Sequence, residues 1–142
     1  MKAITLFYDA DCGICTACVD WLTRQAQSSG KTLVVIAYQN EKQIENFPMI
    51  DRRHADLGIQ TLSFDGKVRR DAAACAACLR ELPRWRWLGI CMDLPLLKNA
   101  FQAGYRLVAN NRRTLSRWFG LEACRVGKAP GASNPVVSKQ SN

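Results

Sequence analysis

Five of the seven cysteines in this chain of 142 residues stand at C-x-x-C spacing, which serves both dithiol redox chemistry and metal binding. The seven lie at positions 12, 15, 18, 75, 78, 91 and 124. An odd number excludes complete pairing into internal disulfides in a monomer. The composition, 48% hydrophobic and 23% charged, is that of a globular protein and excludes collagen-like, mucin-like and wholly disordered chains.

Cys12 and Cys15 have the sequence context of a reactive dithiol. They follow directly on an apolar run, residues 3–8, and open a segment of helical periodicity. The N–H groups and the positive dipole end at a helix start stabilise the thiolate, which is the nucleophilic form. We expect Cys12, nearer to solvent, to attack a disulfide, and Cys15, one turn later, to resolve the mixed disulfide.

Two carboxylates precede this pair. Asp9 and Asp11 lie close to Cys12 in sequence. A carboxylate beside Cys12 raises the pKa of the thiol, and it can also accept a proton while the mixed disulfide is resolved. Asp9 fits either a structural or a proton-accepting role and is kept as a candidate catalytic residue, whereas Asp11 is expected to be a turn or helix-capping residue.

A metal site is the competing interpretation of the cysteine spacing. Cys12, Cys15, Cys75 and Cys78 form two C-x-x-C pairs about sixty residues apart, which could give a four-thiolate zinc or iron–sulfur site. Such pairs usually stand on turns, whereas Cys75 and Cys78 fall on the apolar face of an Ala-rich helical segment. Packing is therefore the first interpretation of the second pair, a second redox pair the next, and metal the last.

Cys18 is expected to be a small core residue. Helical spacing places it on one stripe with Ile14, Trp21 and Leu22. We assign no function to Cys91, Cys124 or the only histidine, His54.

The elements that hold the Cys12–Cys15 turn form a β-α-β unit. Residues 3–8 read as a buried strand, residues 12–26 as a helix and residues 32–38 as a second buried strand, parallel to the first. Residues 40–57 are polar and predict one or two short helices broken at Pro48.

A hairpin and a helix complete the predicted core. Residues 60–64 and 67–70 flank Asp65-Gly66, a strong hairpin signal. Asp71 is expected to cap a helix that runs to Leu82. This order, β-α-β, then hairpin, then helix, predicts an α/β fold of thioredoxin-like connectivity over residues 1–82.

A basic helical extension is predicted over residues 83–126. One helix starts at Asp93 and Pro95 and ends at Asn110-Asn111, and residues 114–119 form a short second one. Residues 127–142 have the composition of a disordered tail. Of the net charge of +8, residues 1–70 carry +1 and residues 71–142 carry +7, so the charge belongs to the extension.

The extension interleaves arginine and tryptophan, as nucleic-acid and membrane-surface binders do. We favour the simpler interpretation, a solvated helical face with its aromatic rings turned into the core. Partner docking comes next and nucleic acid last. The chain shows no secretory signal and no membrane-spanning stretch, so we expect no membrane partner and a cytoplasmic location.

Residues 7–15, which read FYDADCGIC, resemble the D-x-x-C-x-x-C signature of the DCC family of thiol-disulfide oxidoreductases. Residues 64–68 with 71–73, residues 105–112, and Gly120 and Cys124 resemble later parts of that family. The resemblance covers residues 3–125. It implies a thioredoxin-like fold with a helical extension, and it places Asp9, Cys12 and Cys15 in the signature, with the two cysteines as the redox pair.

We therefore expect an enzyme that exchanges thiols and disulfides through Cys12 and Cys15. Its partners would be a disulfide-containing protein or small-thiol substrate and a cellular dithiol reductant, and it would need no organic cofactor and no metal. A metal-binding module and a basic interaction module are the alternatives.

Overall fold

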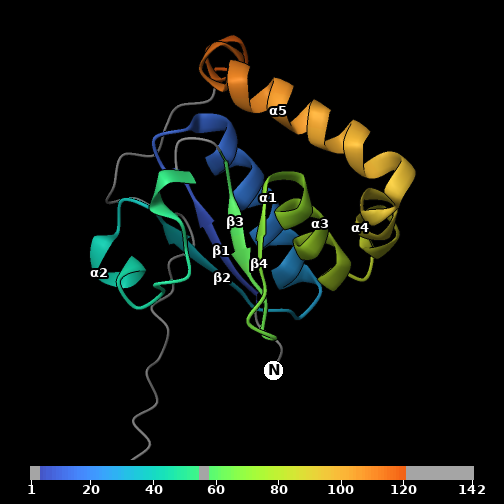
Figure 1. The fold of residues 1–142 in the computed structure, drawn as a ribbon, viewed down its shortest axis with the longest axis horizontal. Helices are drawn as coiled ribbons and strands as arrows, with labels where there is room; N and C mark the ends of the chain where they lie inside the picture. Colours follow the sequence, from blue (N-terminus) through green and yellow to red (C-terminus); the bar gives the residue numbers. More distant parts are fainter. Residues whose placement is uncertain (1–3, 55–57, 121–142) are drawn as a thin grey trace, which may run out of the picture.

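A computed structural model describes residues 4–54 and 58–120 of the chain. Around a four-stranded sheet it places five helices and one short 3-10 turn within these residues (Figure 1). The elements are β1 Ile4–Tyr8, α1 Gly13–Ser28, β2 Leu33–Ala37, α2 Glu41–Ile44, the 3-10 turn η1 Arg52–His54, β3 Gln60–Leu62, β4 Val68–Arg70, α3 Asp71–Glu81, α4 Arg86–Asp93 and α5 Pro95–Trp118.

The sheet has the strand order β2-β1-β3-β4. Strand β1 pairs in parallel with β2 and antiparallel with β3, and β3 and β4 form a hairpin. Gly66 in the hairpin turn has a φ of +77°, a conformation that glycine adopts without cost. The predicted α/β class, the β-α-β unit, the hairpin and the helix after it are confirmed, and the arrangement is consistent with a thioredoxin-like fold.

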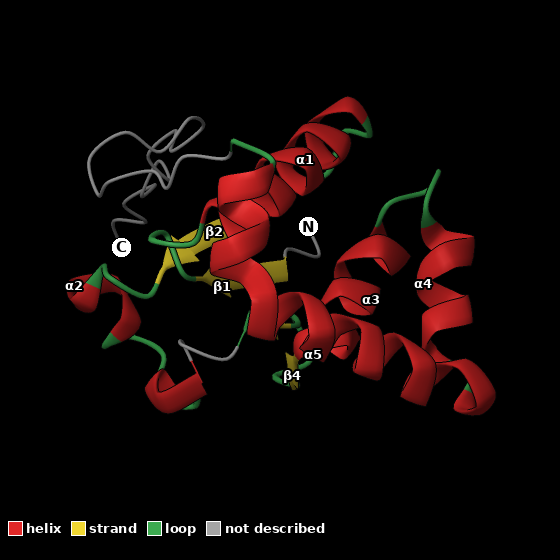
Figure 2. Ribbon diagram, turned by 90° about the horizontal axis from the view of Figure 1, so that it is seen from above, coloured by secondary structure: helices red, strands yellow, loops and turns green. Residues whose placement is uncertain are grey.

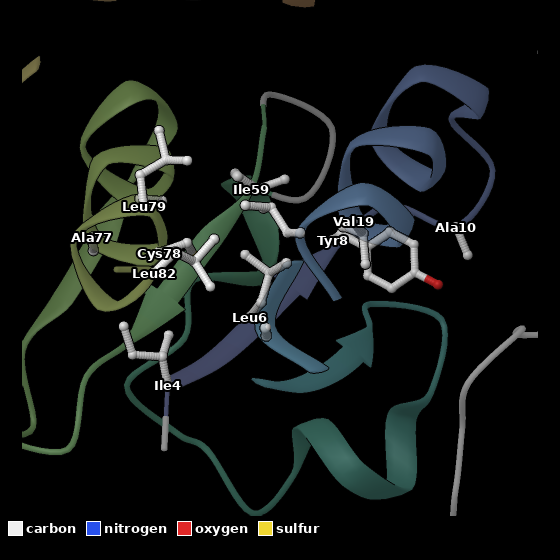
Figure 3. Packing of buried hydrophobic residues seen from close by; sticks show 13 residues of the cluster. Ile4, Leu6, Tyr8, Ala10, Val19, Ile59, Ala77, Cys78, Leu79 and Leu82 are labelled. Carbon is white, nitrogen blue, oxygen red and sulfur yellow. The ribbon is translucent and has the colours of Figure 1, made fainter. Parts of the chain in front are cut away.

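Alternation along β1 builds a core on each face of the sheet. Ile4, Leu6 and Tyr8 face the cluster formed with α1 and α3, where Figure 3 shows them beside Val19 and Leu79. The second cluster, on the other face, contains Phe7, Ile36, Ile44 and Ile50. Both ends of the β1–α1 turn are therefore fixed by buried side chains.

The predicted core stripe of α1 is wrong in part. The buried face consists of Gly13, Thr16, Val19, Leu22 and Ala26. Cys18 is exposed, and Trp21 is 38% exposed. The Trp21 ring packs edge-on against Trp85, with 5.1 Å between ring centroids, so it points to the segment before α4 instead of the sheet.

Asp71 does not cap α3. It is the first residue of the helix, has a φ of +53°, and Arg70 occupies the cap position without a side-chain hydrogen bond. Its carboxylate is instead held by His54 Nε2 at 2.8 Å and by Gln102 Nε2 at 3.1 Å. The Asp71 carboxylate therefore bonds residues distant in sequence and not the free N–H groups at the start of α3.

The extension is more continuous than predicted. Helix α4 was not foreseen, and α5 runs unbroken through Asn110-Asn111 to Trp118. The Asn111 side chain donates a hydrogen bond to the Leu107 carbonyl, 2.8 Å away and one turn earlier, so it remains compatible with the helix. Figures 1 and 2 show α5 beside α3 and across the start of α1. The predicted disordered tail and Cys124 lie outside the described residues.

Close packing between α3 and α4 depends on Gly89. A Cβ atom there would lie 2.7 Å from the Ala76 carbonyl oxygen and 2.8 Å from the Arg80 nitrogen, both backbone atoms. We expect Gly89→Ala to lower the free energy of unfolding by about 1–3 kcal/mol, because the helices must separate.

Gly104→Ala in α5 is the matched control for this substitution. A Cβ there meets no atom within 4 Å. This change should raise the free energy of unfolding by about 0.5–1 kcal/mol, through helix propensity alone. Urea unfolding of both variants checks the pair, and equal stability of Gly89→Ala and the original protein would contradict the expectation.

Candidate active site

Cys12 occupies the N-cap of α1, directly after β1 and the loop 9–11. Its backbone is extended, with φ −101° and ψ 110°, and its carbonyl accepts the first helical hydrogen bond, from Thr16 N at 3.0 Å. The Cys12 sulfur accepts a hydrogen bond from Cys15 N at 3.4 Å. A cysteine thus fills the position that Ser, Thr, Asp or Asn usually fills, with sulfur as the acceptor for a free helix N–H group.

This position places negative charge on Cys12. Its pKa is lowered from 9.0 to about 6, chiefly by the hydrogen bond with the Cys15 side chain. Burial opposes the shift, the Cys15 N–H and the Arg112 cation add to it, and the Asp9 carboxylate weakens it. At neutral pH the Cys12 sulfur is therefore a thiolate.

Cys15 is the protonated partner of this pair. Its pKa is raised because its thiol donates to the Cys12 sulfur, because it is buried, and because the Cys12 charge repels a second charge. The negative charge of the pair therefore lies on the Cys12 sulfur, and the proton lies on the Cys15 sulfur.

The expectation that Cys12 would be nearer to solvent than Cys15 is wrong. Cys12 is buried, with 6% of its surface exposed, whereas Cys15 is of intermediate exposure. Helix α5 lies over the start of α1, where Ser116 Oγ accepts a hydrogen bond from Ile14 N at 3.2 Å. The extension therefore takes part in the site.

Asp9 lies in a polar network at the end of β1. Its Oδ1 accepts hydrogen bonds from Gln39 Nε2 at 2.7 Å and from Asp11 N at 2.9 Å. Its Oδ2 lies 3.4 Å from Arg112 Nη1. Asp11 is exposed and does not cap α1, because its carboxylate accepts from Gln39 Nε2 at 3.2 Å and Cys12 holds the cap position. Of the two carboxylates, Asp9 is the one built into the site.

Arg112 is the residue of this site that the sequence did not reveal as functional. Its side chain is 11% exposed and pairs with Asp9, which is 13% exposed, so this ion pair is largely removed from water. Arginine within the basic extension is expected to face solvent, and no local pattern distinguishes Arg112 from its neighbour Arg113. Arg112 lies on the inner face of α5, seven residues after Tyr105, and only the packing of α5 on the core shows which face is the inner one.

A second polar cluster fastens α5 to the sheet. The Tyr105 hydroxyl accepts a hydrogen bond from Ile59 N at 2.9 Å, directly before β3. Gln102 on the same helix donates to Asp71, which also bonds His54. Burial raises the pKa of Tyr105, so its hydroxyl stays neutral. His54 is thus part of the contacts that join η1, α3 and α5.

The remaining described cysteines, Cys18, Cys75, Cys78 and Cys91, are free thiols. Burial raises the pKa of Cys78 to about 12 and holds that of Cys75 well above its ordinary value. Cys78 is 3% exposed in the core cluster and Cys75 packs against it, which supports the packing interpretation. Across residues 4–54 and 58–120, no group of three or more His, Cys, Asp or Glu side chains is arranged to hold a metal ion, so the four-cysteine metal site is not formed there.

Comparison with known proteins gives one finding. A family model described as DCC1-like thiol-disulfide oxidoreductase matches residues 6–118. The matched segment contains Asp9, Cys12, Cys15 and Arg112 and the whole of α5. The comparisons with curated proteins and with solved structures gave no match. Among the described helices, none is long and apolar enough to cross a membrane.

Proposed function

The chain belongs to the DCC1-like thiol-disulfide oxidoreductase family, and from this premise we propose that it reduces disulfides through Cys12 and Cys15. The observation that carries the proposal is the N-cap position of Cys12, whose sulfur accepts the Cys15 N–H at 3.4 Å. A thiolate held in this way is a nucleophile at neutral pH, and a second thiol stands one helical turn away to complete the exchange.

In the first step the Cys12 thiolate attacks one sulfur of a substrate disulfide. A bond forms between Cys12 and that sulfur, the substrate S–S bond breaks, and the other substrate sulfur leaves as a thiolate that takes a proton from water. A mixed disulfide joins Cys12 to the substrate.

In the second step Cys15 resolves the mixed disulfide. The Cys12 charge and its hydrogen bond with the Cys15 thiol both hold the pKa of Cys15 high. Both effects end when Cys12 is bonded to substrate, because its sulfur is then neutral. Cys15 loses its proton and attacks the Cys12 sulfur, a Cys12–Cys15 disulfide forms, and the bond between Cys12 and the substrate breaks. The second substrate sulfur leaves as a thiolate and takes a proton from water, so the substrate gains two electrons from the dithiol and two protons in all.

Asp9 and Arg112 complete the proposed machinery. Asp9 is the carboxylate electrostatically coupled to both thiols, and we assign it the role of accepting the Cys15 proton. Arg112 is a positioning residue that holds Asp9 and favours the Cys12 thiolate.

The substrate class is a disulfide, in a protein or a small thiol compound. A cellular dithiol reductant returns the Cys12–Cys15 disulfide to the dithiol by the same exchange. Electrons are carried by the protein's own sulfurs, so the reaction needs no organic cofactor and no metal. A reducing cytoplasm is the location we propose for such a cycle.

The redox titration of this pair tests the proposal. Protein equilibrated in glutathione or dithiothreitol buffers should lose two alkylatable thiols together, Cys12 and Cys15, along a two-electron curve. A midpoint potential of about −270 mV would indicate a reductase, and a much less negative potential would indicate an oxidant or isomerase.

Cys91→Ser is the matched control for the titration, because Cys91 is a free thiol outside the site. Its curve should coincide with that of the unaltered protein. Independent oxidation of Cys12 and Cys15, or a disulfide that joins either of them to another cysteine, would contradict the proposed function.

A further inference from the structure

The outer face of α5 carries an apolar stripe. Leu96, Leu107 and Trp118 follow one another at intervals of eleven residues, which return to nearly the same side of a helix. They are 91%, 67% and 85% exposed. Ala100 and Ala103, also exposed, fill the same line between the first two. This helix is therefore amphipathic with an apolar side turned to solvent.

A row of arginines borders the stripe. Arg106, Arg113 and Arg117 stand at spacings of seven and four, on one side of the line from Leu107 to Trp118. None of the three forms an ion pair within the described part of the chain. The whole of residues 94–120 contains no acidic side chain. The positive charge along this edge is thus uncompensated.

Helix α4 adds exposed apolar side chains next to the start of α5. Trp87, Ile90 and Leu94 keep a spacing of three and four residues and are 61%, 47% and 45% exposed. Leu88 and Met92, by contrast, pack against the core cluster. The expectation that the aromatic rings of the extension turn into the core therefore holds for Trp85 and Tyr105, and fails for Trp87 and Trp118.

We propose that this outer face, the Leu96–Leu107–Trp118 stripe with its arginine edge, lies on the surface of membranes that contain anionic lipid. An interfacial helix combines Trp and Leu on one side with Arg beside them, and it binds through apolar burial plus attraction to anionic headgroups. The 24 residues of α5 span about 36 Å of straight surface. A second copy of the chain is disfavoured as the occupant, because the same arginine row on both copies would repel.

The proposal is independent of the dithiol chemistry and adds a location to it. The inner face of α5 holds Arg112 and Ser116 over the start of α1, while the outer face contacts lipid. In the docked state α5 would separate the start of α1 from the lipid. Cys12 would then lie about one helix diameter, 10 Å, from the headgroups. The expectation of no membrane partner rested on the absence of a spanning segment and a secretory signal, and on the interpretation of the Arg and Trp pattern as a solvated face. A helix that lies on the membrane surface needs neither a spanning segment nor a signal.

Cosedimentation of the full chain with vesicles tests the proposal. Binding should occur with phosphatidylcholine mixed with phosphatidylglycerol and not with phosphatidylcholine alone, and it should weaken as salt rises. Leu107→Asn with Trp118→Ser should abolish it. Arg113→Glu with Arg117→Glu should reduce partitioning by at least twentyfold, since each cation near the surface contributes about fivefold. Cys12→Ser should bind like the unaltered protein, which separates this test from that of the redox function.

Lys42→Glu with Lys67→Glu is the matched charge control. The pair makes the same change in net charge on α2 and in the turn between β3 and β4, which lie away from α5 (Figure 1). It should reduce binding less than threefold, and far-ultraviolet circular dichroism verifies that every variant is folded. Equal losses in the two charge-reversed proteins, or no binding of the folded protein to anionic vesicles, would overturn the proposal. A dimer in solution that Leu107→Asn disrupts, without vesicle binding, would assign the face to a second copy instead.

Discussion

Cys12→Ser should reduce the rate of disulfide reduction to the uncatalysed background. The reaction begins with attack by the Cys12 sulfur, and the structure lowers the pKa of that thiol to about 6. A serine hydroxyl stays protonated at neutral pH and is a far weaker nucleophile toward sulfur. The helix start that stabilises a thiolate cannot compensate for a difference of this size. Insulin or glutathione disulfide reduction, driven by dithiothreitol, measures the loss.

Cys15→Ser should have a different result, because Cys12 can still attack. The mixed disulfide then has no internal thiol to resolve it, so the protein should accumulate covalently joined to substrate. Mass spectrometry after incubation with glutathione disulfide should find one glutathione on Cys12 per chain. Turnover should fall strongly while the first attack remains fast.

The controls for these two variants are Cys75→Ser and Cys91→Ser. Cys75 is protonated and partly buried, and Cys91 lies on α4, so both variants should retain activity if they fold. Full activity of Cys12→Ser, or equal trapping at Cys12 and Cys15, would contradict the assignment of attacking and resolving thiols.

Arg112→Met should raise the pKa of Cys12 and destabilise the protein. In the unaltered protein the alkylation of Cys12 by iodoacetamide should be half-maximal at about pH 6 and fall tenfold for each pH unit below that, since only the thiolate reacts. Removing the nearby cation disfavours the thiolate, so the curve should move to higher pH. We expect alkylation at pH 6 to slow roughly threefold to tenfold, because the hydrogen bond with Cys15 contributes more than Arg112 does.

The same substitution leaves Asp9 without its charged partner. Asp9 is 13% exposed, and the removal of one member of a buried pair costs about 3–5 kcal/mol. Two hydrogen bonds still reach the Asp9 carboxylate, so we expect a loss of about 2–4 kcal/mol in the free energy of unfolding. Urea unfolding at pH 7 gives this value.

Arg113→Met is the matched control, because Arg113 is the adjacent, exposed arginine. It should change neither the pH profile nor the stability measurably. Asp9→Asn, with Arg112 in place, should move the alkylation curve of Cys12 to lower pH. The reason is that the Asp9 charge raises the pKa of Cys12 in the unaltered protein. A purely structural role of Arg112 would lower stability and leave the pH profile unchanged, and this result would contradict our assignment.

The parts of the molecule that could be read from sequence are those decided over short distances. The runs of apolar residues identify β1 and β2, Asp65-Gly66 identifies the hairpin, and Cys12 at the junction of strand and helix points to the dithiol that we propose as reactive. In each case the decisive interactions lie within a few residues along the chain. Local propensity and the geometry of a helix start are enough to predict them.

The directions in which individual side chains point were predicted less well from the sequence. Trp21 looked like a core residue of α1, yet the core face runs through Val19 and Leu22, because Trp85 gives the ring a partner on another side. Asp71 had the sequence position of a cap but bonds His54 and Gln102 instead. In both places a partner distant in sequence offered a better contact than the local one.

By itself the sequence determined the order of the elements and the identity of the Cys12–Cys15 pair, since hydrophobic period and the strand-to-helix turn depend on neighbouring residues. Only the tertiary structure decided that α5 folds back over this pair, that Arg112 meets Asp9 at 3.4 Å, and that Cys12 is buried. Those contacts join residues about a hundred positions apart. Their formation depends on how helices pack in space, which no local pattern encodes, and the same packing leaves the opposite side of α5 facing outward.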